Sequence, residues 1–127
     1  MQGRHTEAKG IFSEIRIKFE ATFGPTHCKT LETTCRLASV YESLEMHSEA
    51  EKLRTFVFNA NLEQRAPDDL DTLKTMAALA RTLKGSGRHT DAIKMLEGCV
   101  KRYQRVLGPD HVFTKTFSQM SADWRAD

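Results

Sequence analysis

The chain has 127 residues, of which 39% are hydrophobic and 28% are charged, and 19 basic against 17 acidic residues give a formal net charge of +2. The two signs are interspersed, so the chain lacks the concentrated basic face that a phosphate backbone requires, and no nucleic-acid partner is expected. No segment reaches the roughly 20 consecutive apolar residues that span a bilayer, so no membrane partner is expected. The length fits one domain, and three prolines among many helix-forming residues predict an all-α fold.

The sequence repeats itself with a period of 42 residues. Four residue types recur at this interval: Ala8, Ala50 and Ala92; Pro25, Pro67 and Pro109; Thr30, Thr72 and Thr114; and His5, His47 and His89. The stretch GRHTEA at 3–8 also returns as GRHTDA at 87–92. Such a period predicts stacked helical hairpins, because a single hairpin cannot bury both of its apolar faces.

In chain order, the first predicted element is a helix over 4–23 with the pattern of the second helix of a hairpin. Full hairpins are predicted over 27–65 and 69–107, and a single terminal helix over 111–125. The whole chain, 1–127, is therefore expected to form one repeat domain of about six helices.

The predicted helix ends coincide with glycine, proline and short polar residues. Gly24 and Gly108, each followed directly by proline, are expected to end the second helices of their hairpins. Thr26, Asp68 and Asp110 follow the three prolines and are predicted N-caps of the first helices, because a short side-chain oxygen accepts an unpaired backbone N–H.

Three stretches resemble the tetratricopeptide repeat in its 42-residue form, the kinesin-light-chain type. They are Leu37-Ala38-Ser39-Val40-Tyr41, Gly87-Arg88-His89-Thr90-Asp91-Ala92 and Val106-Leu107-Gly108-Pro109-Asp110-His111. The resemblance covers the chain and implies an all-α, tetratricopeptide-like α-solenoid of antiparallel hairpins. It also implies a scaffold that binds proteins or peptides and has no enzyme activity.

The last segment, 114–124, is similar to the closing half-repeat of fungal NOD-like receptor proteins, as is the spacer Leu107-Gly108-Pro109-Asp110-His111. In that family such repeats follow a nucleotide-binding domain. The similarity implies that the chain is the C-terminal sensor or adaptor part of a longer protein.

The residues that could carry metal or catalytic chemistry do not form a recognisable site. His5, His47 and His89 recur once per repeat, and successive helices lie ~8–10 Å apart, so they are expected to pack at hairpin turns and not to share a metal ion. Gly85-Ser86-Gly87 lacks the pattern of a phosphate-binding loop. We expect no metal, no cofactor and no catalytic residues.

Three cysteines, an odd number, follow no close metal-binding spacing. Cys28 and Cys35 are seven residues apart, and Cys99 lies in another repeat. They are expected to be reduced thiols packed in or near the core, which predicts a cytoplasmic protein.

The candidate binding site is the concave face that first helices line in this fold. Counted from the packing residues Leu37 and Leu79, the predicted partner-binding positions are Glu32, Cys35, Arg36, Ser39, Lys74, Ala77, Ala78, Arg81, Gln119, Met120 and Asp123. Arg36, Lys74 and Arg81 form a positive stretch suited to carboxylates of a peptide. The alternative, that these are ordinary solvated charges, stays open at this point.

Kinesin-light-chain repeats carry an asparagine pair in the first helix that holds the peptide backbone. The matching positions are Cys35-Arg36 and Ala77-Ala78, so that clamp is absent. A shallower, more apolar groove around Ala77, Ala78 and Met120 is therefore expected.

Two functional hypotheses follow, from different classes. The first is a binding module whose concave face holds a peptide or partner protein. The second is a self-association module, a homo-oligomer formed through the N-terminal helix, in which Ile11, Ile15, Phe19 and Phe23 lack the first helix of their hairpin.

Overall fold

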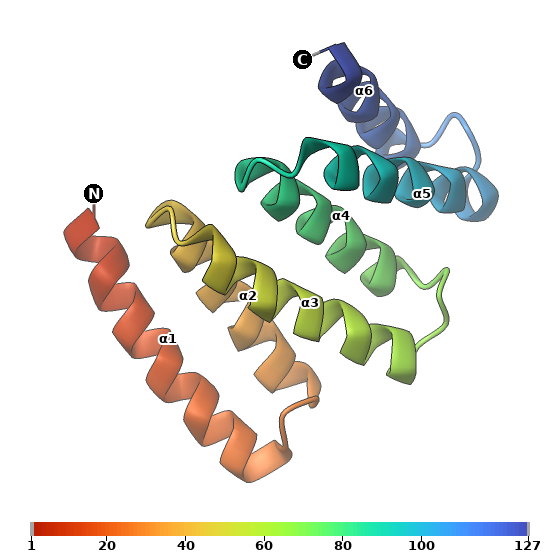
Figure 1. The fold of residues 1–127 in the computed structure, drawn as a ribbon. Coiled ribbons are helices and arrows are strands. Elements are labelled where there is room, and N and C mark those ends of the chain that lie inside the picture. The colour runs from red at the N-terminus through yellow and green to blue at the C-terminus, as the bar shows by residue number, and fades with distance from the viewer. Residues whose placement is uncertain (1, 127) are drawn as a thin grey trace. The chain divides into compact units, whose positions relative to one another are not determined.

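The structure is a computed structural model that describes residues 2–126, with side chains from residue 3 onward (Figure 1). It contains six α-helices within these residues: α1 (Gln2–Phe23), α2 (Cys28–Ser43), α3 (His47–Gln64), α4 (Leu70–Gly85), α5 (His89–Leu107) and α6 (Val112–Ala126). The expected number of helices is confirmed. None of the helices in the described residues is long and apolar enough to cross a membrane.

The chain divides into two compact units, Met1–Ala60 and Asn61–Asp127. In the first unit, α1 packs along α2. The next contact is between α2 and α3, where Leu31 packs with Val57 and Ala60 in a small core that Cys35 borders. Burial of such side chains is the main source of stability for helices of this length.

The second unit is built around α5, which packs against both α4 and α6. Leu73, Leu96, Cys99 and Tyr103 are each 0% exposed, so the apolar stripes of α4 and α5 meet in a closed core. The Cys99 thiol donates to the Leu73 carbonyl at 3.4 Å, and the Tyr103 ring stacks on Phe117 of α6 at 5.2 Å between centroids. These contacts join all three helices.

The glycines at the helix ends behave as predicted, whereas the N-caps lie one residue later than expected. Gly24 and Gly108 have φ of 91° and 86° and follow the last residues of α1 and α5. In this left-handed region glycine has no steric penalty.

The observed first-helix caps are His27, Asp69 and His111, not Thr26, Asp68 and Asp110. The ring Nδ1 of His27 accepts from the Lys29 amide at 3.2 Å, and Asp69 Oδ1 accepts from the Asp71 amide at 2.9 Å. The reason is that proline and the residue after it together form a turn, and the capping residue follows that turn.

Candidate functional site

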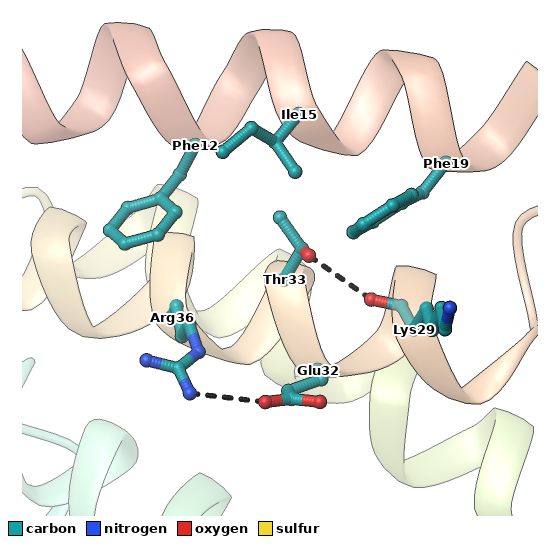
Figure 2. A pocket seen from close by; sticks show the side chains of 7 residues that line it. All are labelled: Phe12, Ile15, Phe19, Lys29, Glu32, Thr33 and Arg36. Atoms are coloured by element: carbon teal, nitrogen blue, oxygen red, sulfur yellow. Dashed lines mark hydrogen bonds and ion pairs between the residues drawn. The ribbon is translucent and has the colours of Figure 1, made fainter.

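A groove runs between α1 and α2 in the first unit (Figure 2). Phe12, Ile15 and Phe19 line its α1 side, and their spacing places them on one face of that helix. All three are only half-buried, although they are large and apolar. The groove has a volume of about 410 Å³.

The α2 side of the groove is polar at its rim. Figure 2 shows Thr33 directed toward α1, with its hydroxyl donating to the Lys29 carbonyl at 3.0 Å. Arg36 and Glu32 form an exposed ion pair at 3.0 Å across one turn. The Lys29 ammonium lies 5.2 Å from the centre of the Phe23 ring.

This combination of an apolar wall and a charged rim suits a partner with an apolar face. Aromatic and aliphatic walls supply contact area, and rim charges orient a partner at modest gain in affinity. Among residues 2–126, no three His, Cys, Asp or Glu side chains come together in a way that could hold a metal ion.

Of the predicted site residues in the first unit, Glu32 and Arg36 line this groove, and two others have partners on α3 or in the core. Cys35 borders the core of α2 and α3, and burial raises the pKa of its thiol. Ser39 is exposed, and its hydroxyl accepts from the Arg54 guanidinium at 2.9 Å.

In the second unit, the predicted positions of α4 differ in exposure. Lys74 and Arg81 are exposed, and Ala78 is half-buried. Ala77 is 1% exposed, so its side chain belongs to the core and is not accessible to a partner.

The predicted positions of α6 also differ in exposure. The Gln119 amide donates to Asp123 at 2.9 Å, and both residues are exposed. Met120 is half-buried. The second unit therefore presents Lys74, Arg81 and the Gln119–Asp123 pair at its surface.

The cysteines and the recurring histidines occupy different environments. Cys28 is exposed and Cys99 is buried, and burial raises the pKa of Cys99 to about 12. His47 is the first residue of α3 and is half-buried, whereas His89 at the start of α5 is exposed.

Sequence reasoning missed the α1–α2 groove as a unit. Ile15 and Phe19 were expected to be partly exposed, but Phe12, Lys29 and Thr33 were not singled out. The repeat contains the missing signal, because Phe12, Ile15 and Phe19 occupy the register positions of Leu96, Cys99 and Tyr103 two periods later.

Antiparallel helical hairpins that recur with one register define this chain as a helical-repeat protein. A family model described as tetratricopeptide repeat matches residues 72–112, which run from the first turn of α4 through α5 to the first residue of α6. The resemblance to tetratricopeptide repeats and the predicted all-α, tetratricopeptide-like fold class are thereby confirmed.

Two solved structures have a similar fold. Both contain nearly identical TPR-like repeats ascribed to a kinesin light chain of Podosopora anserina, and the second is a point variant of the first. Each is 20% identical to this chain and covers 96% of it, with TM-scores of 0.83 and 0.84. The chain spans 58% and 57% of their lengths. No curated protein matches the chain.

Proposed function

We propose that the chain is a protein-interaction scaffold that binds a peptide or partner protein on the exposed faces of its first helices. The proposal rests mainly on Lys74 and Arg81. They lie seven residues apart, on one face of α4, and both are exposed. Two cations at this spacing match carboxylates about two helical turns, ~10 Å, apart on a partner.

The first unit offers a mixed-charge face of its own on α2. Arg36 and Glu32 are exposed and paired with each other, and a partner carboxylate would compete with Glu32 for the guanidinium. Because an exposed ion pair is weak, this exchange costs little. The proposal is for binding alone and includes no catalytic step or cofactor.

A peptide array that varies acidic content tests this function. Binding of the wild type is compared with the double variant Lys74→Glu/Arg81→Glu. The charge-matched control is Lys94→Glu/Lys101→Glu on α5, because these two exposed residues are also seven residues apart. Selective loss of acidic hits in the first variant supports the proposal. Equal binding by all three proteins to every specific hit would overturn the assignment to α4.

We further propose that the chain is the C-terminal sensor or adaptor part of a longer cytoplasmic protein of the NOD-like receptor type. The polar face of α6 supports this position in an array. Where α4 has Leu73 and Met76, α6 has Lys115 and Ser118. Terminal repeats carry such polar faces. Sequencing of the complete transcript tests the proposal, and a product without a nucleotide-binding domain would contradict it.

Self-association is the alternative function, and the exposure of α1 favours it. Ile11 is 56% exposed and Phe23 is 41% exposed, although both are apolar. Exposed apolar surface of this kind promotes association. Light scattering over a range of concentrations decides the matter, since a strict monomer throughout rules this function out.

A further inference from the structure

One tetrapeptide adopts two different structures in this chain. Gly3-Arg4-His5-Thr6 lies inside α1, whereas the identical Gly87-Arg88-His89-Thr90 begins in the turn between α4 and α5, with Gly87 and Arg88 in the turn and His89 and Thr90 at the start of α5. At the second site Gly87 has φ of 88°, and the Arg88 amide donates to the Leu83 carbonyl of α4 at 3.0 Å. Because the residues are the same, the presence of α4 accounts for the turn.

The α1 face that follows this tetrapeptide differs in burial from its counterpart in α5. Leu96, Cys99 and Tyr103 are each 0% exposed. Their register equivalents in α1 are the groove residues Phe12, Ile15 and Phe19, which are only half-buried. Phe12 and Ile15 are larger than their buried counterparts, and Phe19 is aromatic like Tyr103, so the difference in burial comes from the covering helix.

In the second unit, α4 is the helix that covers this face. The Leu73 carbonyl accepts from Cys99, and the Met76 sulfur lies 3.8 Å from the Arg102 guanidinium on α5. A further contact reaches α6, where the Lys84 ammonium lies 5.4 Å from the centre of the Trp124 ring. Thus α4 occupies the place beside α5 and α6 that is open beside α1 and α2.

The α2 side of the groove shows the same relationship between residues two periods apart. Thr33 of α2 has the register position of Phe117 in α6, and Tyr103 stacks on Phe117 beneath α4. Thr33 and Phe19, the equivalent pair, both line the open groove (Figure 2). Comparison of the two copies therefore indicates that a helix like α4 fits into the α1–α2 groove.

We propose that the α1–α2 groove is a docking site for an amphipathic helix of the first-helix type of this repeat. Its contact face carries apolar and small residues in the pattern of Leu73, Met76, Ala77 and Ala80 in α4. On docking, the helix completes a hairpin with α1 when it is joined to Gly3, and Gly3 and Arg4 then form the turn, as Gly87 and Arg88 do between α4 and α5. This surface is distinct from the charged α4 face proposed above to bind peptides.

A peptide corresponding to residues 69–86 is the direct probe of the groove. It should bind the intact chain saturably, as measured by fluorescence anisotropy with a labelled peptide. Ile15→Lys should weaken binding by about tenfold or more, because it places a charge in the centre of the apolar wall. Ile17→Lys is the matched control, since Ile17 is 66% exposed on the same helix and does not line the groove.

The same titration distinguishes a docked amphipathic helix from a second copy of the chain in the groove. A peptide carrying Ala77→Glu and Ala80→Glu should not bind, because both positions lie on the buried face of α4. Equal affinity of the wild type and the Ile15→Lys variant for the unmodified peptide would overturn the proposal. The proposal would also be overturned if the wild type formed a dimer that Ile15→Lys abolishes and that the peptide does not displace. The occupant of the groove would then be a second copy of the chain.

A grafted chain tests the proposal without a substitution in the groove. Residues 68–86 are placed directly before Gly3, which reproduces the α4–α5 junction because the next four residues are identical. The graft should unfold at a higher temperature than the wild type, and the same graft with Leu73→Glu and Ala80→Glu should not. Equal unfolding temperatures of both grafts would overturn the proposal.

Discussion

The Arg54 guanidinium on α3 donates to the Glu42 carboxylate on α2 at 2.6 Å and so joins the two helices of the first full hairpin. The same guanidinium donates to the Ser39 hydroxyl at 2.9 Å. The Arg54 side chain is only 13% exposed and that of Glu42 28%, so water screens this pair less than the surface pairs of the chain.

Replacement of Arg54 by alanine should destabilise the protein by about 1–3 kcal/mol, because Glu42 then loses a charge-assisted hydrogen bond in a partly buried site. Arg36→Ala is the control, since it removes an ion pair whose side chains are 61% and 67% exposed and should cost less than about 0.5 kcal/mol. Denaturant unfolding gives both values. Equal losses of stability in the two variants would show that the Arg54–Glu42 pair contributes no more than an exposed ion pair.

The register of the repeat leads to a stabilising substitution at Glu45. This residue has φ of 60°, and its equivalent two helices later, Gly87, has φ of 88°. A left-handed conformation costs a non-glycine residue roughly 1–2 kcal/mol, part of which the greater unfolded-state freedom of glycine offsets. Glu45→Gly should therefore raise the free energy of unfolding by about 0.5–1 kcal/mol. Thermal unfolding checks the sign, and a lower midpoint would contradict the prediction.

The fold could be predicted because the residues that mark helix ends and helix contacts recur every 42 residues, so each helix is indicated by more than one copy of the pattern. Glycine and proline ended α1 and α5 where expected, since backbone geometry leaves few alternatives there. The caps were assigned one residue early because neighbouring positions such as Asp68 and Asp69 both carry a capping side chain. The turn that contains the first of them decides which one reaches the helix, and Asp68 instead binds Arg105 at 2.9 Å.

Which of the proposed binding positions are exposed could be predicted only in part, because each step of one residue turns the direction of the side chain by about 100° around the helix. Lys74 and Arg81 are exposed as a binding residue must be, whereas Ala77 lies in the core. The α1–α2 groove depends on which helix covers α1, and the sequence of α1 alone does not specify that. Comparison of Phe12 with Leu96 across two periods would have indicated it.

The hydrogen bond between Asp68 and Arg105 should appear in the acid titration of the protein. The Arg105 guanidinium lowers the pKa of Asp68 below its usual value of 3.8, chiefly through this hydrogen bond. In the Arg105→Gln variant the Asp68 pKa should return toward that value. An NMR titration of the carboxyl group measures the change, and an unaltered pKa in the variant would show that the pair does not persist in solution.

The three thiols should react at very different rates with a thiol reagent at pH 8. Cys28 is exposed, whereas burial raises the pKa of Cys99 to about 12 and leaves almost none of it as the reactive thiolate. Cys28 should react first, Cys35 more slowly, and Cys99 only when the protein is denatured. Mass spectrometry of partly labelled protein gives the order, and early labelling of Cys99 would contradict the packed α4–α5 core.

Tyr103 is 0% exposed, and its hydroxyl has no hydrogen-bond partner among the described residues. Removal of that hydroxyl should therefore be tolerated, and Tyr103→Phe should change the stability by less than about 0.5 kcal/mol. Loss of the ring is different, because it packs on Phe117, and Tyr103→Ala should cost about 3–5 kcal/mol. A loss above about 1 kcal/mol in Tyr103→Phe would show that the hydroxyl is bonded in solution.

The stability of the protein should fall as the pH rises from about 9 to 12, because two buried groups keep their protons in the folded state. Burial raises the pKa of Cys99 from 9.0 to about 12 and that of Tyr103 from 10.0 to about 12. Between the ordinary and the raised pKa, the unfolded chain loses protons that the folded chain retains. The stabilisation from each group is therefore complete below its ordinary pKa and is lost as the pH rises through its raised pKa. Denaturant midpoints measured at several pH values test this, and Tyr103→Phe should flatten the decline above pH 10 while leaving the Cys99 part. An equally steep decline in that variant would mean that Tyr103 ionises freely in the folded protein.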